Sequence, residues 1–452
     1  MSPFGFTPDN NDEENPKPDD FAAMMRQMQE QIQKQFQELG INPAGFINPF
    51  ANFAPGAKGQ QEALPIATVR DTSKKFVQAQ GSQPLGTKDV TVVNNALEIA
   101  ELWLNEATVF PATAIGAAHT SLSRLDWVDE TLPGWQATME PLATGLAAAI
   151  SSLLDQAVAG QGGADADGQA DAVAALAGSM GAIAGLLRSF IGSMIATQLG
   201  QAIGAISSNA TGAHDVALPL LDPARPILIP ENIEKWSADI EIPKTEVYLF
   251  HALREAAIAR LFAHNPWIVS YMRSAIVEYG RGIRIDMEAI QRQAEEAMQN
   301  FDPTQMNPES GANSFNIALN NGIFTPEETP EQRAALSKLE TALALVDGWA
   351  DEVTTLASGD RLPSITQLRE IYRRQRATNA PAQQLFKSLL GLEVSPKLTR
   401  EASAFWQKVR ESKDVASRDA LWSGILPSAE ELLDPVAFLS STQVPDDLSG
   451  LL

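Results

Sequence analysis

Apolar residues recur every three or four positions along most of the chain, which is the spacing of a helix with one buried face. An amphipathic helix is predicted after Asp20, which can serve as its N-cap, and Gly40 ends it. The same spacing returns from Asp89 and again over 125–154, where it continues into an Ala-rich stretch. A mainly helical protein is therefore expected.

Two helices in the second half have clear end signals. A helix over 245–264 ends before Pro266, because proline disfavours the helical conformation in the residue that precedes it. A later helix begins at Thr329, which forms a capping box with Gln332, and Gly359 ends it.

The regions between and before these helices have other compositions. Residues 1–20 carry six acids and one Lys, so they predict a disordered acidic tail, and 21–60 is read as the amphipathic helix followed by a linker. Short apolar runs broken by four prolines over 216–242 predict one or two edge strands or extended loops. The expected fold class is mainly α (α+β), with a few short strands.

Two interpretations are open for residues 172–206, whose glycines have spacings that allow helices to approach closely. One interpretation is a membrane hairpin. Against it, the stretch is rich in Ala, Gly, Ser and Gln, and its single charge, Arg188, lies near the middle. An Arg at bilayer depth costs at least about 2.5–3.5 kcal/mol. We therefore favour closely packed helices inside a soluble domain.

Composition excludes several classes of function. The 33 Lys and Arg against 56 Asp and Glu give a net charge of −23, which repels nucleic acid. The absence of Cys removes disulfides, thiolate metal sites and Cys nucleophiles, and only four His are available as metal ligands. No basic segment followed by an apolar one opens the sequence, so a cytoplasmic location is expected.

The helix over 245–264 contains Arg254-Glu255-Ala256-Ala257-Ile258, which has the spacing of the zinc motif H-E-x-x-H. In that motif, two His at i and i+4 bind zinc from one helix face, and the Glu is the general base. Only the Glu is present here. A single Glu on a helix carries no information by itself.

Longer blocks of sequence give the motif its context. They resemble a family of actinobacterial proteins described as hydrolases or zinc-dependent metalloproteases with a zincin-like core, over about 90–450 and the extreme N-terminus. The resemblance implies a zincin-like domain at 215–452, and the helical, Ala/Gly-rich region at 89–214 is expected to pack on it. The blocks include PFGF near the start, WVDETLPGW (127–135), LREAAIARLFAHNPWI (253–268), LETALALVDGWADEV (339–353) and LPSAEELLDPVAFL (426–439).

The resemblance places the family's three metal ligands at Arg254, Ile258 and Asp347, and its general base at Glu255. An Arg stays protonated and has no lone pair to donate, and Ile has no donor atom. Asp347 could still coordinate, but it is one methylene shorter than the Glu of metal-competent members. We therefore expect no zinc cofactor in this protein, although the metal-competent members use zinc, and Glu255 becomes a vestigial base.

Two further arrangements are considered at these positions. His251, Glu255 and Asp347 could form an alternative metal site, but this would use the general base as a ligand. We favour instead a His251 that makes one hydrogen bond on a partly buried helix face. We also predict that Arg254 and Asp347 form an ion pair in the vacated site, rather than both reaching solvent.

A basic run stands out in this acidic chain, formed by Arg369, Arg373, Arg374 and Arg376 around Tyr372. On a helix it could bind a phosphate or the acidic tail of a partner. Pairing with nearby acids is favoured, and the N-terminal acids are candidates.

The sequence favours a metalloprotease-like pseudoenzyme that binds a protein or peptide partner. One alternative is an active zinc-dependent hydrolase of the same family, which the resemblance alone favours. A second is a membrane-associated helical protein, which rests on 172–206.

Overall fold

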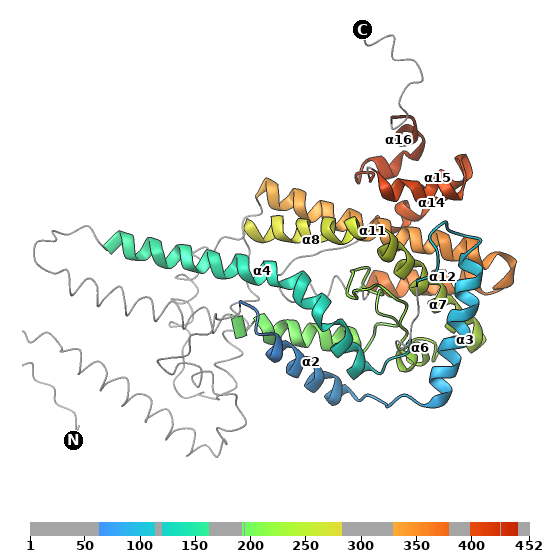
Figure 1. The fold of residues 1–452 in the computed structure, drawn as a ribbon, viewed down its shortest axis with the longest axis horizontal. Coiled ribbons are helices and arrows are strands. Elements are labelled where there is room, and N and C mark those ends of the chain that lie inside the picture. Colours follow the sequence, from blue (N-terminus) through green and yellow to red (C-terminus); the bar gives the residue numbers. More distant parts are fainter. Residues whose placement is uncertain are drawn as a thin grey trace, which may run out of the picture. The chain divides into compact units, whose positions relative to one another are not determined.

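The computed structural model shows a helical protein (Figure 1). The chain divides into two compact units, Met1–Gln61 and Glu62–Leu452, and all residues described below lie in the second. The predicted acidic tail and the first amphipathic helix with its linker lie outside the described residues. The structure describes residues 63–113, 120–161, 192–193, 195–282, 329–378, 398–424 and 426–441.

Helices account for most of this part of the chain. The longer ones are α2 (Ile66–Gln80), α3 (Thr87–Leu104), α4 (Arg124–Gln161), α7 (Lys244–His264), α8 (Pro266–Arg281), α11 (Pro330–Ser358), α12 (Ile365–Thr378) and α14 (Thr399–Ser412). The shorter ones are α6 (Pro230–Trp236), α15 (Val415–Ala420), α16 (Pro435–Ser441) and three 3-10 turns at Gly359–Arg361, Leu421–Ser423 and Glu431–Leu433. Residues 195–207 are helical as well.

The mainly α fold class is confirmed. The few short strands that were expected are observed only as isolated β-bridges. Among the described residues, Leu228 forms isolated bridges with Ser121 and with Gly212, and no longer strand is present. Of the two predictions for 216–242, the loop is observed over 216–229, whereas Pro230–Trp236 forms helix α6, which neither prediction included. The prolines of the loop lack the N–H that a continuous ladder requires.

Helix α7 packs against α3, α11, α8, α6 and α12. Every residue from Val247 to Phe262 is buried, so the helix has no solvent-facing side over this length. Buried polar groups are costly unless they find partners. The polar side chains of α7 must therefore be satisfied inside the protein, which makes this helix the place where internal polar networks form.

Helix α11 provides the second wall of that interior. The capping box predicted at its start is present, because Thr329 and Gln332 each bond the other's backbone N–H, at 3.1 and 3.2 Å. Gly359 ends the helix at φ 47°, in the left-handed region that suits glycine. At Gly348, a Cβ atom would lie 2.6 Å from the Cβ of Ala402, so α14 approaches α11 closely there.

The helices predicted from Asp89 and over 125–154 are confirmed as α3 and α4. Part of the Gly-rich stretch, 195–206, is helical and packs close to α2: a Cβ at Gly200 would lie 2.6 Å from Thr72. In the part of the chain that the structure describes, no helix is long and apolar enough to cross a membrane. The predicted domain division at residue 215 stays a prediction.

Candidate functional site

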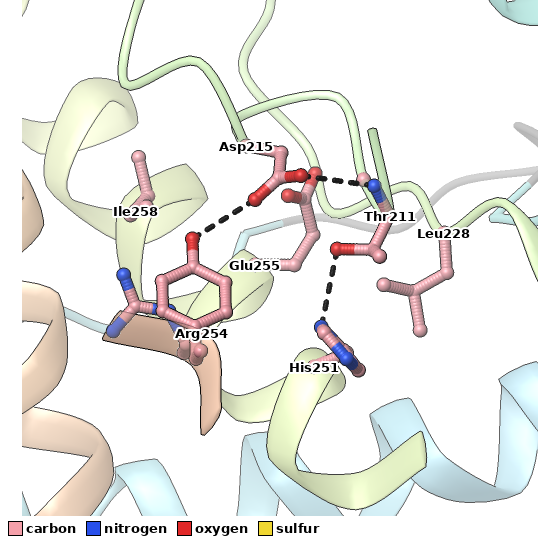
Figure 2. Close-up of a pocket in the computed structure, with 9 residues that line it drawn as sticks. Thr211, Asp215, Leu228, His251, Arg254, Glu255 and Ile258 are labelled. Atoms are coloured by element: carbon pink, nitrogen blue, oxygen red, sulfur yellow. Dashed lines mark hydrogen bonds between the residues drawn. The ribbon is translucent and has the colours of Figure 1, made fainter. Parts of the chain in front are cut away.

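One face of α7 carries the residues that the sequence singled out. His251, Arg254, Glu255 and Ile258 are spaced so that they point to the same side of a helix, and all four line one small cavity (Figure 2). About 10 Å³ of this cavity is open to the centre of a water molecule, which is room for a single water. The remaining lining residues are Thr211, Gly212, Asp215, Leu228 and Tyr372.

The carboxylate of Glu255 accepts hydrogen bonds from residues of the segment that precedes α6. Its Oε1 accepts hydrogen bonds from the backbone N–H groups of Ala213 and Ile227 at 3.0 and 3.1 Å. The ring Nδ1 of His214 lies 2.9 Å from the same oxygen, and the backbone N–H of His214 donates to Oε2 at 3.0 Å. Because a carboxylate only accepts, Nδ1 of His214 carries the proton. Glu255 therefore ties this segment to α7.

Space around Glu255 is equally restricted. A Cβ atom at Gly212 would lie 2.3 Å from Oε2 of Glu255, so only glycine fits at that position. The Glu255 side chain is 4% exposed. A general base must reach the proton that it removes, either directly or through one water. With both oxygens in internal hydrogen bonds, the Glu255 carboxylate serves as a structural anchor in this fold.

His251 is a buried neutral side chain. Its Nδ1 lies 3.1 Å from the hydroxyl of Thr211, so the single predicted hydrogen bond is confirmed, but its helix face is fully rather than partly buried. Burial lowers the pKa of His251 to about 3, and the positive charges of Arg254 and Arg376 add to that effect against the opposing charge of Asp215. His251 is therefore uncharged at neutral pH.

The ion pair predicted between Arg254 and Asp347 is confirmed. The guanidinium also lies 3.8 Å from Asp351 and 4.2 Å above the ring of Tyr372. Only 5% of the Arg254 side chain is exposed. Although burial opposes its charge, Tyr372, Asp347 and Asp351 together raise the pKa of Arg254 above its usual value. A permanent cation therefore stands between α7 and α11.

Asp351 is the residue that sequence reasoning missed. Both its oxygens bind Arg369, at 2.9 and 2.6 Å, and Oδ2 also accepts from Arg373 and from Ser403 at 2.7 Å. Burial alone would raise the pKa of Asp351, but Arg369, then Arg254 and Arg373, hold it well below its usual range. Its position one helical turn after a predicted site residue was a usable signal.

The basic run on α12 pairs with acids, as predicted. In addition to the contacts with Asp351, Arg376 binds Asp215 at 2.8 Å, and Arg374 binds Glu370 on the same helix. The hydroxyl of Tyr372 donates to Asp215 at 2.9 Å. These acids come from α11, α12 and the segment before α6. The N-terminal acids, the other candidates, lie outside the described residues.

Comparison with known proteins places this arrangement in a family. A family model described as zincin-like metallopeptidase matches residues 66–439, which is most of the chain. The chain belongs to the zincin-like metallopeptidase family. This confirms the resemblance seen in the sequence. No curated protein matches the chain.

A solved structure shares the fold of this zincin-like protein. It is a "putative hydrolase with a novel fold" from Chloroflexus aurantiacus, with 16% sequence identity and a TM-score of 0.54. The similarity covers 84% of this chain and 98% of the other. At this identity the likeness concerns the fold alone.

The residues present do not fit the zinc ion that the family name implies. Arg254 and Ile258 offer no metal-binding atom, and Arg254 brings a positive charge that would repel a cation. His251, Glu255 and Asp347, the alternative set, do not form a metal-holding group either, and each already contacts another partner: Thr211, Ala213 and Arg254. The described part of this zincin-like protein contains no group of three or more His, Cys, Asp or Glu side chains able to hold a metal.

Proposed function

We propose that this zincin-like protein has lost zinc-dependent hydrolysis and acts by binding a protein or peptide partner beside the former metal site. The observation that carries the proposal is the buried Arg254 guanidinium, paired with Asp347; the resemblance assigns both residues to ligand positions of the family. An internal cation of this kind takes the place of the metal charge between α7 and α11. The ion pair of Arg254 joins α7 to α11, but a guanidinium does not act as a Lewis acid in the way that zinc does.

Two further observations support the loss of hydrolysis. Glu255 accepts hydrogen bonds from four internal donor groups, which hold its carboxylate in place within the fold. The cavity beside it holds at most one water, so a peptide bond does not fit within reach of Glu255. A protein that keeps the fold of its family but lacks the catalytic groups can still bind other molecules. We therefore assign partner binding to this protein. Family membership alone favours the alternative, an active hydrolase.

The metal content of the purified protein tests this proposal. We expect far less than one equivalent of zinc in protein prepared without chelator, measured by elemental analysis. We also expect no zinc-dependent cleavage of a mixed fluorogenic peptide library. Near-stoichiometric zinc that disappears in the His251→Ala and Asp347→Ala variants, together with cleavage, would establish the active hydrolase instead.

A further inference from the structure

Helix α3 carries apolar residues on two sides. The side that faces the core is formed by the buried residues Val93, Ala96, Leu97, Ala100 and Leu104. The side turned away from them carries Ile99 and Leu102, whose exposed fractions are 42% and 65%. A helix that is apolar on both sides is normally buried on both. The outward side of α3 therefore has the composition of an interface.

Exposed apolar residues are concentrated in this part of the protein. Among the described residues, six large apolar side chains are exposed, and four of them lie between Val90 and Val109. Leu102 and the half-buried Trp103 follow Ile99 by three and four residues, so both lie beside it on the helix surface. Single exposed apolar residues are ordinary, whereas adjoining ones mark binding surfaces. We call Ile99, Leu102 and Trp103 the outer α3 patch.

Acidic side chains flank the outer α3 patch. Glu98 is exposed and has no ion-pair partner among the described residues. Glu106 is 68% exposed and pairs with Arg361 at 3.0 Å, and the guanidinium of Arg361 lies 4.8 Å from the centre of the Trp103 ring. The single Lys of α3, Lys88, lies about three helical turns before Ile99. The cation that contacts the patch is therefore already paired, and Glu98 is available to a partner.

We propose that the outer α3 patch binds an amphipathic helix of a partner protein that carries apolar residues on one face and Lys or Arg beside them. The apolar residues would bury Ile99 and Leu102, in the way that helices pack against one another. The basic residues would pair with Glu98 and, in competition with Arg361, with Glu106.

The inference rests on the proposed partner binding and names both the surface and the chemistry of the partner. Helix α3 packs directly on α7, and Nε of Arg260 on α7 donates to Glu101 on α3 at 2.7 Å. The proposed surface is therefore on the outer side of a helix that supports the former metal site.

The charge of the whole chain decides between possible occupants of the patch. A second copy would bring a net charge of −23 against −23, so self-association is opposed. A basic segment is attracted by the same field, which also accelerates its encounter with the protein. A basic partner therefore fits this surface better than a second copy of the chain.

Fluorescence anisotropy of the full chain tests the surface with a fluorescein-labelled peptide that repeats the heptad Leu-Lys-Lys-Leu-Leu-Lys-Leu. We expect saturable binding, weakened about tenfold or more by Leu102→Ser, because contact with a large apolar side chain is lost. Leu433→Ser is the matched control, since Leu433 is 67% exposed but lies outside the patch. It should change the affinity less than about twofold. No binding by the unaltered protein, or equal weakening in both variants, would overturn the proposal.

Two further measurements test the charge of the partner and replace a variant that does not fold. Glu98→Gln should weaken binding about two- to fourfold at low salt and less at high salt, because the ion pair is screened. A peptide with Glu in place of Lys should bind at least about tenfold more weakly, and equal or tighter binding would refute a basic partner. If Leu102→Ser is unfolded by circular dichroism, Ile99→Ser takes its place, and an affinity that it leaves unchanged would refute the patch.

Sedimentation and zinc content on the same samples separate the remaining outcomes. We expect a monomer, whereas a dimer that Leu102→Ser dissociates would assign the patch to a second copy and overturn the proposal. Bound zinc and peptide cleavage, with peptide binding that still depends on Leu102, would refute the loss of hydrolysis and support the patch. A zinc-free protein whose peptide binding ignores Leu102 would refute the patch alone.

Discussion

Removing one partner of the Arg254–Asp347 ion pair should destabilise the protein more than removing both. The two side chains are 5% and 16% exposed, so either charge is poorly hydrated when left alone. In Arg254→Met, Asp347 loses the only ion-pair partner that the described residues give it. In Asp347→Leu, Arg254 keeps Asp351 at 3.8 Å and the Tyr372 ring. The two single variants should therefore differ.

The structure sets the expected magnitudes. Breaking a buried pair costs about 3–5 kcal/mol, whereas replacing both partners by apolar groups is often close to neutral. Because Asp347 retains some solvent, we expect Arg254→Met near the lower end, about 3 kcal/mol. Asp347→Leu should cost about 1–2 kcal/mol, since Arg254 remains partnered. The double variant should cost about 1 kcal/mol, so part of the loss is recovered.

Urea unfolding at neutral pH, monitored by circular dichroism, measures the three changes, provided that the urea dependence of the unfolding free energy stays constant. The double-mutant cycle should give a coupling of about 2 kcal/mol or more. A matched cycle on the exposed pair of Lys244 and Glu234 should give less than about 1 kcal/mol. Additive effects of Arg254→Met and Asp347→Leu would remove the buried ion pair from this account.

Three other predictions concern the same face of α7. Glu255→Gln should destabilise the protein by about 2–4 kcal/mol in urea unfolding, because an amide cannot accept all four hydrogen bonds; an unaffected stability would contradict the anchor role. His251 has a folded pKa of about 3, below its unfolded value of 6.5, so its contribution is intact above pH 6.5 and is lost as the pH falls towards 3. Between pH 7.5 and 5, His251→Gln should therefore lose about 2 kcal/mol less stability than the unaltered protein, and parallel pH profiles would refute this. The triple variant Arg254→His, Ile258→His, Asp347→Glu should bind zinc in elemental analysis without cleaving peptides, since Glu255 stays engaged. A folded triple variant without zinc would mean that these are not the family's ligand positions.

Local signals in the sequence determined much of the helical framework. The capping box at Thr329 and the glycine stop at Gly359 act within one or two helical turns, so they can be read without a fold. The same holds for Pro266, which follows the end of α7. Residue chemistry alone also showed that Arg254 and Ile258 cannot bind a metal, and this led to the predicted ion pair with Asp347.

The fold decided what the sequence left open, because those contacts join residues far apart in the chain. Glu255 could be read as a vestigial base, but its role as an anchor depends on backbone N–H groups of residues 213, 214 and 227, which no side-chain pattern reveals. The β-prone residues of 216–242 form no strand: the chain is a loop as far as Ile229, with isolated bridges at Leu228, and then forms helix α6. The role of Asp351 on α11 depends on its contacts with α12 and α14, which the sequence does not predict.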